Sequence, residues 1–270
     1  MENTSLEQET SGLSLKEYHD TCFDAKMMSD TYFIKESAFF DDTIRGLLPA
    51  LIKIFSSGDV KGNTLIQLSF PPDLHYCFTA CAHFTEIIVG TVTDSCFKAL
   101  EKWRKNEADA PDMSHALQVV CDNEGNRETC IEKEKLMRSK MRPVRKCDVT
   151  KSNPFYPEVL PHADCLLLTH CLELQTTDTA SFCSYLKNVT ELLKPRGHLV
   201  MVVAIKTSFY MVGNFKYPHM CFDEGFLRKA VTDIGCSILD LQLLPRNVQC
   251  LQEISDYSAF IVLNACKEIK

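Results

Sequence analysis

The chain has 270 residues, 45% of them hydrophobic and 24% charged, which is enough to bury a substantial core and excludes an intrinsically disordered protein. Its 29 Lys and Arg against 36 Asp and Glu give a formal net charge of −7, which argues against nucleic acid as a partner. No segment reaches the ~18 consecutive apolar residues of a membrane span. Because residues 1–11 are polar and acidic, unlike a secretory signal, we expect a cytoplasmic protein without a membrane partner.

Two residue counts stand out. The ten glycines are about 4% of the 270 residues, whereas roughly 7% is usual. The fourteen cysteines are scattered and form no C-x-x-C motif, so we expect no metal site. Several cysteines lie inside apolar runs, which favours buried, reduced thiols.

Hydrophobic periodicity predicts alternating helices and strands from about residue 43 onward. In the first half we expect a helix over 44–55, a strand over 64–68, a short helix over 74–83, a strand over 86–90, a helix over 94–105 capped by Asp94 or Ser95, and a strand over 117–120. In the second half we expect a helix over 129–141, a strand over 164–169, a helix over 179–193, a strand over 198–205, a helix over 223–234, and strands over 238–244 and 257–263.

This alternation indicates an α/β fold. Strands that are continuously apolar are typical of a mostly parallel, doubly wound sheet covered on both faces. The last two strands have no helix between them and are expected to pair antiparallel. Residues 1–42 precede the alternation and are expected to form an N-terminal extension and lid, with residues 43–270 as one α/β domain.

Ligands of such sheets bind beyond the carboxyl ends of the strands, where the first turn normally carries glycines. Here that turn, from Ser69 to Asp73, has no glycine, and Pro71 and Pro72 each lack an N–H donor. The turn is either simply a rigid loop or a departure from the usual ligand cradle. After the second strand, Asp94 is the nearest carboxylate, and its position suits a helix N-cap at least as well as ribose binding.

Six segments together resemble the family of nicotinamide, indolethylamine and phenylethanolamine N-methyltransferases, and most of all its nicotinamide branch. The resemblance runs from about Tyr18 to the last predicted strand, and the segments are ALEKW (99–103), CDNEGNR (121–127), KCDVT (146–150), ADC (163–165), LLKPRGHLV (192–200) and FYMVG (209–213). It implies a seven-stranded class I methyltransferase sheet with an N-terminal helical lid. It also implies S-adenosylmethionine as methyl donor and a small amine or pyridine as acceptor. We further expect a monomer.

The resemblance also implies site residues. Cofactor-binding positions would be Tyr18, Cys147, Asp148, Val149 and Thr169, and substrate-binding positions would be Tyr18 and Tyr210. Asp148 could equally cap a turn with Thr150, and Tyr210 could be an ordinary half-buried aromatic. No residue is assigned a catalytic role.

Several positions depart from the pattern of this family. Ser69-Phe70-Pro71-Pro72 replaces its glycine-rich turn, Thr91 its ribose-binding acid and Val203 its substrate-orienting acid; His75, Cys96 and Phe23 are further replacements. Because Ser69, Pro71 and Thr91 all weaken the donor site, we expect an intact fold with an eroded S-adenosylmethionine site. Phe70 or a proline ring would then lie where the amino-acid tail of the donor belongs.

The resulting prediction is a pseudoenzyme that is inactive or weakly active. One alternative is an active methyltransferase of a small amine, pyridine, indole or thioether, in which His75 or Asp94 contacts the donor. Another is a non-catalytic protein that binds a different small molecule or has a structural role.

Overall fold

Seven strands form the central sheet in the order β3-β2-β1-β4-β5-β9-β8. The computed structural model describes residues 13–125, 129–248 and 251–269. The strands are β1 (Gly62–Ser69), β2 (Phe84–Thr91), β3 (Arg145–Lys146), β4 (Ala163–Thr169), β5 (Leu193–Ile205), β8 (Cys236–Pro245) and β9 (Ala259–Lys267). Pairing is parallel from β3 to β5, whereas β9 runs antiparallel to both β5 and β8. The predicted doubly wound, mostly parallel sheet is confirmed, as is the antiparallel pairing of the last two strands.

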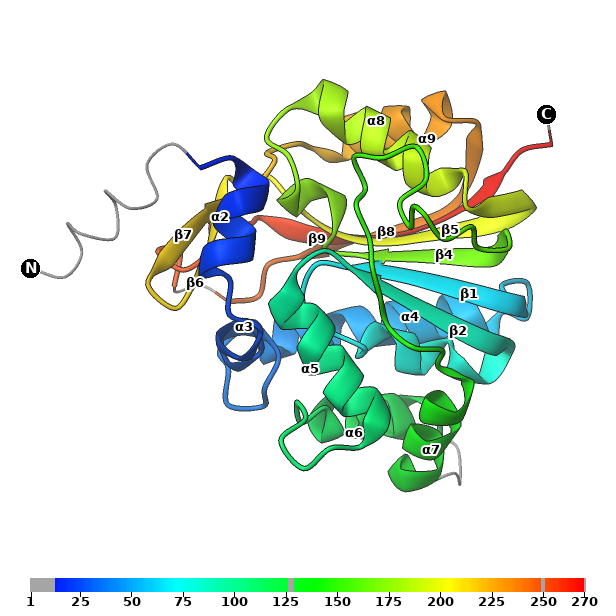
Figure 1. Cartoon of the computed structure of the whole chain (residues 1–270), viewed down its shortest axis with the longest axis horizontal. Coiled ribbons are helices and arrows are strands. Elements are labelled where there is room, and N and C mark those ends of the chain that lie inside the picture. Colours follow the sequence, from blue (N-terminus) through cyan, green and yellow to red (C-terminus); the bar gives the residue numbers. More distant parts are fainter. Residues whose placement is uncertain (1–12, 126–128, 249–250, 270) are drawn as a thin grey trace, which may run out of the picture.

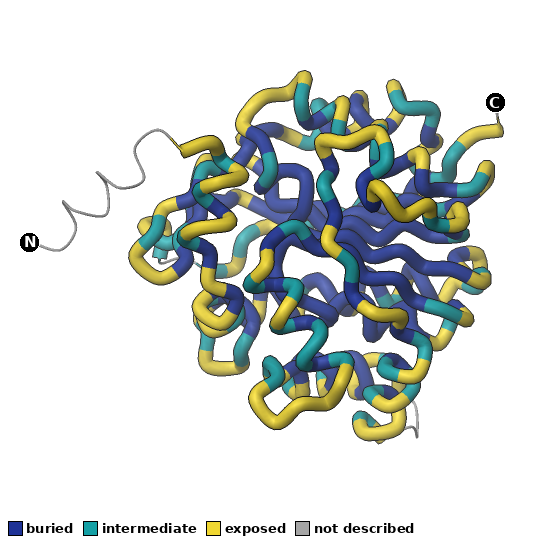
Figure 2. The backbone as a smooth tube through the Cα atoms, in the orientation of Figure 1, coloured by how far each residue is buried: buried dark blue, intermediate teal, exposed yellow. Residues whose placement is uncertain are grey.

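Helices cover both faces of this sheet (Figure 1). On one face lie α4 (Leu47–Ser56), α5 (Asp94–Lys105), α6 (Ser114–Glu124) and α7 (Cys130–Lys140), and on the other α8 (Thr179–Thr190) and α9 (Glu224–Asp233). Each face has its own cluster of buried apolar side chains. The strands between them form the most deeply buried layer of the molecule (Figure 2), as expected for a sheet covered on both sides.

The N-terminal helices α2 (Leu15–Cys22) and α3 (Ala25–Tyr32) lie at one end of the sheet, next to a hairpin of β6 (Phe209–Val212) and β7 (Phe215–Pro218) (Figure 1). Ser14 and Glu17 form a capping box that begins α2, and Asp24 caps α3. The chain then passes through a π-helical turn, η1 (Asp41–Gly46), into α4. Both helices fall inside the segment predicted as a lid.

Three predicted elements differ from the structure. Residues 117–120 belong to helix α6, because Ala116, Leu117, Val120 and Cys121 follow helical spacing and are the buried residues of that helix. The predicted helix over 74–83 is instead two short 3₁₀ turns, η2 (Tyr76–Thr79) and η3 (Cys81–His83). At the end of the first turn, the Thr79 hydroxyl donates a hydrogen bond to the Tyr76 carbonyl oxygen three residues earlier. The N-cap of α5 is Thr93, not Asp94 or Ser95.

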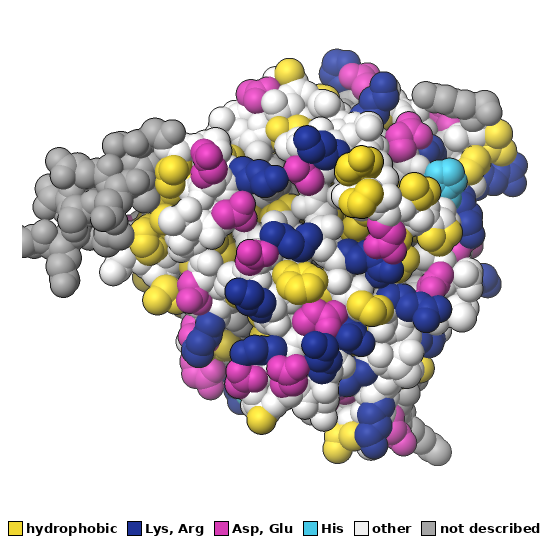
Figure 3. Space-filling model, viewed as in Figure 1, with side chains coloured by type: hydrophobic (Ala, Val, Ile, Leu, Met, Phe, Trp, Pro, Cys, Tyr) yellow, Lys and Arg dark blue, Asp and Glu magenta, His cyan; other side chains and the backbone are white. Residues whose placement is uncertain are grey.

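Within the described residues, no helix is long and apolar enough to span a membrane, and no group of three or more His, Cys, Asp or Glu side chains has the arrangement of a metal site. Acidic and basic side chains are interspersed over the face shown in Figure 3, without a continuous basic patch there. A further short turn, η4 (Leu172–Leu174), follows β4 at the carboxyl ends of the parallel strands.

Candidate functional site

The turn after β1 closes on itself through buried polar groups. The Ser69 hydroxyl lies 2.7 Å from the Pro71 carbonyl oxygen and 3.0 Å from Asp73 Oδ2, while Gln67 Nε2 donates to the Asp73 carbonyl at 3.0 Å. Asp73 is completely buried, and burial raises the pKa of its carboxyl to about 8. These groups bind one another, so the turn offers few free donors to a ligand.

Phe70 directs its side chain from this turn toward α2, in the segment predicted as a lid. The ring is completely buried, with its centroid 4.5 Å from that of His19 and 4.7 Å from that of Phe23, both in or beside α2. The Phe70 carbonyl accepts a hydrogen bond from Cys96 Sγ at 3.0 Å. The first turn and the lid are therefore joined by a packed aromatic contact.

A stack of three rings continues from Phe70 to the hairpin. His19 stacks on Tyr217 at 5.2 Å, and Tyr217 stacks on Tyr210 at 5.2 Å. His19 Nε2 lies 3.1 Å from the Tyr210 hydroxyl, whereas the other ring nitrogen, Nδ1, has no partner among the described residues. Burial lowers the pKa of His19 to about 3, so the imidazole is neutral at physiological pH.

Replacing Tyr210 with Phe is expected to destabilise the fold by about 1–3 kcal/mol, because it leaves both ring nitrogens of the buried His19 without a partner. Adding His19→Phe to that variant is expected to recover much of the loss, since neither member of the pair is then polar. Urea unfolding of the two single variants and the double variant measures this coupling. Additive losses in the double variant would show that the hydrogen bond does not stabilise the lid.

Tyr210 itself is almost completely buried, and Tyr18, the other predicted substrate position, lies nearer the surface. The Tyr18 ring packs against Tyr217 at 4.9 Å, and its hydroxyl donates to the Lys216 carbonyl at 3.4 Å. The structure thus brings both predicted tyrosines to the same ring, Tyr217, which sequence reasoning did not single out. The sequence pattern that could have identified Tyr217 is the alternation of a short strand, in which Tyr217 lies two residues after Phe215 and points to the same face.

The predicted cofactor positions Cys147, Asp148 and Val149 follow β3 directly. The Cys147 amide donates to the Thr91 carbonyl at 2.9 Å, and Val149 is buried. Asp148 accepts a hydrogen bond from the Thr150 hydroxyl at 2.6 Å and forms an ion pair with Lys16 of the lid at 3.0 Å. These partners lower the pKa of the Asp148 carboxyl in spite of its partial burial.

A cavity of about 230 Å³ lies between α2 and this segment. Its polar lining includes Lys16, Thr93, Asp148 and Gln175, with Tyr185 at its side. Gln175 also lines the cavity, and its amide nitrogen is buried without a partner among the described residues. Cys147 and Asp148 both line the cavity.

Thr169 lies elsewhere, at the end of β4. Its hydroxyl is buried 3.4 Å from Gln67 Nε2 and 3.5 Å from Asp73 Oδ1, within the polar group of the first turn. The structure therefore places this predicted cofactor residue against the turn, while Cys147 and Asp148 line the cavity.

The positions discussed above as departures from the N-methyltransferase pattern, or as possible replacements for its donor contacts, are mostly buried. Thr91 and Val203 have almost no exposed surface, and the Thr91 hydroxyl has no partner among the described residues. His75 is buried against Phe33 at 5.1 Å, and burial lowers its pKa to about 3. Asp94 points to solvent, with 66% of its side chain exposed, and pairs with Lys146 at 2.6 Å.

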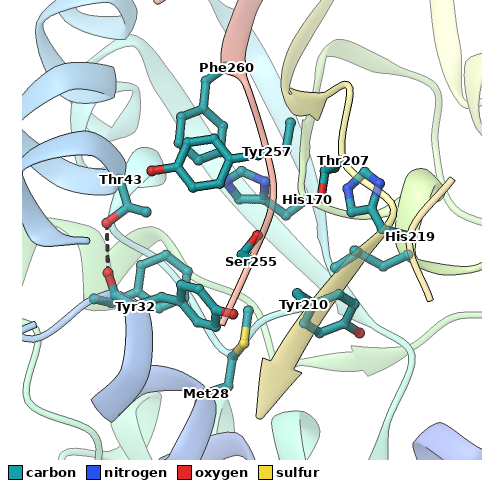
Figure 4. A pocket seen from close by; sticks show the side chains of 13 residues that line it. Met28, Tyr32, Thr43, His170, Thr207, Tyr210, His219, Ser255, Tyr257 and Phe260 are labelled. Atoms are coloured by element: carbon teal, nitrogen blue, oxygen red, sulfur yellow. Dashed lines mark hydrogen bonds between the residues drawn. The ribbon is translucent and has the colours of Figure 1, made fainter. Parts of the chain in front are cut away.

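A second, smaller cavity of about 50 Å³ lies deeper, beside Tyr210 (Figure 4). Figure 4 shows the imidazole rings of His170 and His219 on one side, with Tyr32 and Tyr257 on the other. Burial lowers the pKa of His170 to about 3 and that of His219 to about 4. This volume holds a few water molecules and is far below the ~300 Å³ of an ordinary small-molecule site.

Glu173, in η4, lies close to this cavity. It is almost fully buried, burial raises its carboxyl pKa to about 8, and its Oε1 lies 3.8 Å from His170 Nδ1. Sequence reasoning missed His170 and Glu173. The signal for His170 was its place directly after a strand, at the edge where such sheets bind ligands.

Comparison with known proteins gives consistent results. The profile of the NNMT/PNMT/TEMT family matches residues 13–267. Nicotinamide N-methyltransferase of Sus scrofa is 37% identical over 240 residues, which are 88% of this chain and 90% of the relative. Nicotinamide N-methyltransferase of Homo sapiens is 40% identical over 195 residues, 72% of this chain and 74% of the relative. Indolethylamine N-methyltransferase of Oryctolagus cuniculus is 36% identical over 200 residues, 74% of this chain and 76% of the relative.

Solved structures share the fold. Magnesium protoporphyrin IX methyltransferase from Synechocystis PCC 6803 has a TM-score of 0.59 at 9% identity, covering 96% of this chain and 100% of that chain. The likeness concerns the arrangement of the strands and helices, and it confirms the predicted class I methyltransferase fold.

Proposed function

This chain belongs to the NNMT/PNMT/TEMT family of small-molecule N-methyltransferases, and we propose that it keeps the fold while having lost effective binding of S-adenosylmethionine and most or all methyl transfer. The proposal rests above all on Phe70. In open α/β sheets the ligand approaches the turn after the first strand, and in this chain a buried phenyl ring fills the space between that turn and the lid.

The residues of this edge do not fit the methyl donor. Two of the five residues from Ser69 to Asp73 are prolines without N–H groups, and the polar groups that remain bind one another. Thr91, in place of an acid, is buried and cannot accept hydrogen bonds from ribose as a carboxylate does. Since a hydrogen bond to a charged group contributes about 1.5–3 kcal/mol, this one change weakens binding by roughly 10- to 100-fold.

Methyl transfer depends on holding donor and acceptor in line, so weak donor binding removes the activity as well. The acceptor side supports the same proposal. Val203 is apolar where the family has a substrate-orienting acid, and Tyr210 uses its hydroxyl to bind His19. The inner cavity beside Tyr210 is too small for an aromatic amine without movement of the lid.

A second candidate, non-catalytic binding of a small molecule, is favoured by the cavity of about 230 Å³ at Cys147 and Asp148. Its walls carry the Lys16–Asp148 ion pair and the carboxylate of Asp20, and Phe70 is not among the residues that line it. A planar heterocycle with a hydrogen-bond acceptor suits this lining better than a zwitterionic tail does.

Thermal unfolding with S-adenosylmethionine and with S-adenosylhomocysteine tests the proposal. A ligand at about 100 times its dissociation constant stabilises the folded state by ~2.7 kcal/mol, which is readily measured. We expect no shift at millimolar concentrations of either compound, with nicotinamide N-methyltransferase of Homo sapiens shifting under the same conditions. A clear shift, followed by methyl transfer to any amine, contradicts the proposal. A shift with adenosine alone supports the second candidate.

A further inference from the structure

Two cysteines meet where the ends of α6 and α7 pack together. Cys121 lies in the last turns of α6, and Cys130 is the first residue of α7. Cys130 Sγ lies 3.3 Å from Gln118 Oε1, and Gln118 lies one helical turn before Cys121 on the same side of α6, so the two thiols are neighbours. This contact shares no residue with the Phe70 turn and does not depend on the proposed function.

The two thiols differ in access and in chemical environment. Cys130 is partly exposed, at the first residue of the eleven-residue helix α7. Cys121 is buried, and burial together with the neighbouring Cys130 raises the pKa of its thiol. An external reagent therefore reaches the Cys130 thiol first, and the buried Cys121 thiol lies next to it.

We propose that Cys121 and Cys130 form a reversible disulfide modification site that exchanges with low-molecular-weight disulfides such as oxidised glutathione. The Cys130 thiolate attacks one sulfur of glutathione disulfide, breaking its S–S bond and releasing one glutathione thiolate, which takes up a proton. Cys121 then loses its proton and attacks the Cys130 sulfur, releasing the second glutathione. The protein loses two protons and two electrons, and one glutathione disulfide takes them up to become two glutathione thiols.

The pair is better placed than another neighbouring one, Cys236 and Cys266. In the register of β8 and β9, Cys236 pairs with Lys267 and Ser237 with Cys266, so the two cysteines point to opposite faces of the sheet. Cys236 is also almost fully buried. Contact between Cys121 and Cys130, in comparison, makes the second step intramolecular, with the high effective concentration of positioned groups.

Peptide mapping after incubation of the reduced full chain with a glutathione redox buffer tests this proposal. Trypsin cleaves after Lys105, Arg127 and Lys133, so the disulfide links the peptides 106–127 and 128–133. We expect this linked pair to exceed the glutathione adduct of Cys130 by at least about tenfold, because intramolecular attack outpaces capture by a second glutathione. Dithiothreitol should restore both free peptides.

Two variants make the test specific. Cys121→Ser is expected to accumulate the glutathione adduct on Cys130, because the resolving thiol is missing, whereas Cys130→Ser is expected to give neither product. Cys183→Ser, at a partly exposed cysteine of α8, is the matched control and should behave like the wild-type chain. A persistent adduct on Cys130 in the wild-type chain, a dominant link involving Cys236 and Cys266, or no change at all would each overturn the proposal.

Discussion

Unfolding by urea is expected to show maximum stability near pH 6.5, with losses on both the acidic and the alkaline side. Four buried histidines cause the acidic loss: burial lowers the pKa to about 3 for His19, His75 and His170 and to about 4 for His219. In the unfolded chain each binds a proton near pH 6.5. Below that pH the unfolded state binds more protons than the folded state, so stability falls.

Two buried carboxyls cause the alkaline loss. Burial raises the pKa of Asp73 and of Glu173 to about 8, whereas both titrate near pH 4 when unfolded. Between these values the folded state binds more protons, so stability falls as the pH rises. Four histidines outweigh two carboxyls below pH 6.5, and the carboxyls outweigh the remaining protonation of the unfolded histidines above it. At about 1.4 kcal/mol per proton and pH unit, the net loss between pH 6.5 and 8 is on the order of 2 kcal/mol.

The variant Asp73→Asn/Glu173→Gln isolates the alkaline loss. Each amide has nearly the shape of the protonated acid it replaces. The Ser69 hydroxyl, which now donates to Asp73 Oδ2 at 3.0 Å, can accept from an asparagine amide at position 73 while it donates to the Pro71 carbonyl. We expect the alkaline loss to disappear: stability should rise slightly between about pH 6.5 and 7.5, as the unfolded histidines lose their protons, and then stay constant to about pH 8.5. Asp148→Asn is the control, because the pKa of this carboxyl is lowered, and its alkaline loss should match that of the wild-type chain. An unchanged alkaline loss in the double variant would contradict the assignment.

The sequence predicted most of the fold because its strongest patterns come from burial. Strands β1, β2 and β4 are apolar on both faces, so their runs are continuous, and α5 has a regular stripe of buried residues. The run at 117–120 was too short to separate a strand from a helix by periodicity. The hairpin β6–β7 was missed, although Gly213-Asn214 between two alternating runs is a two-residue turn signal, and Gly213 indeed has a φ of 59°.

The candidate site was only partly predictable for a different reason. The loss of glycine at positions 69–72 is visible in the sequence, but which ring of that turn enters the lid depends on packing. His19 was not recognised, because a histidine in a short helix has no local signal of burial. Its partner Tyr210 lies 191 residues further along the chain. Long-range contacts of this kind decide which side chain fills a site, and single-sequence patterns do not contain them.

Combining Phe70→Ala with Ser69→Gly, Pro71→Gly and Thr91→Asp is expected to create measurable binding of S-adenosylmethionine. Removing the phenyl ring opens the space beside His19 and Phe23, and the two glycines return a flexible turn whose amides can face a ligand. The aspartate supplies an acceptor for ribose hydroxyls, which is expected to tighten binding by roughly 10- to 100-fold over the variant that keeps Thr91. Isothermal titration calorimetry measures the dissociation constant of the donor for the rebuilt chain and for the variant that keeps Thr91.

The same change costs stability, so binding and folding have to be separated. Removing a fully buried phenyl ring typically destabilises a protein by about 3–5 kcal/mol. Phe182→Ala is the matched control, because that ring is equally buried but lies in α8 against Phe222 and Phe226. Circular dichroism should show both variants folded at low temperature, and only the rebuilt turn should bind the donor. Equal binding by the Phe182→Ala control, or none by a folded rebuilt chain at millimolar donor, would mean that Phe70 is not what blocks the site.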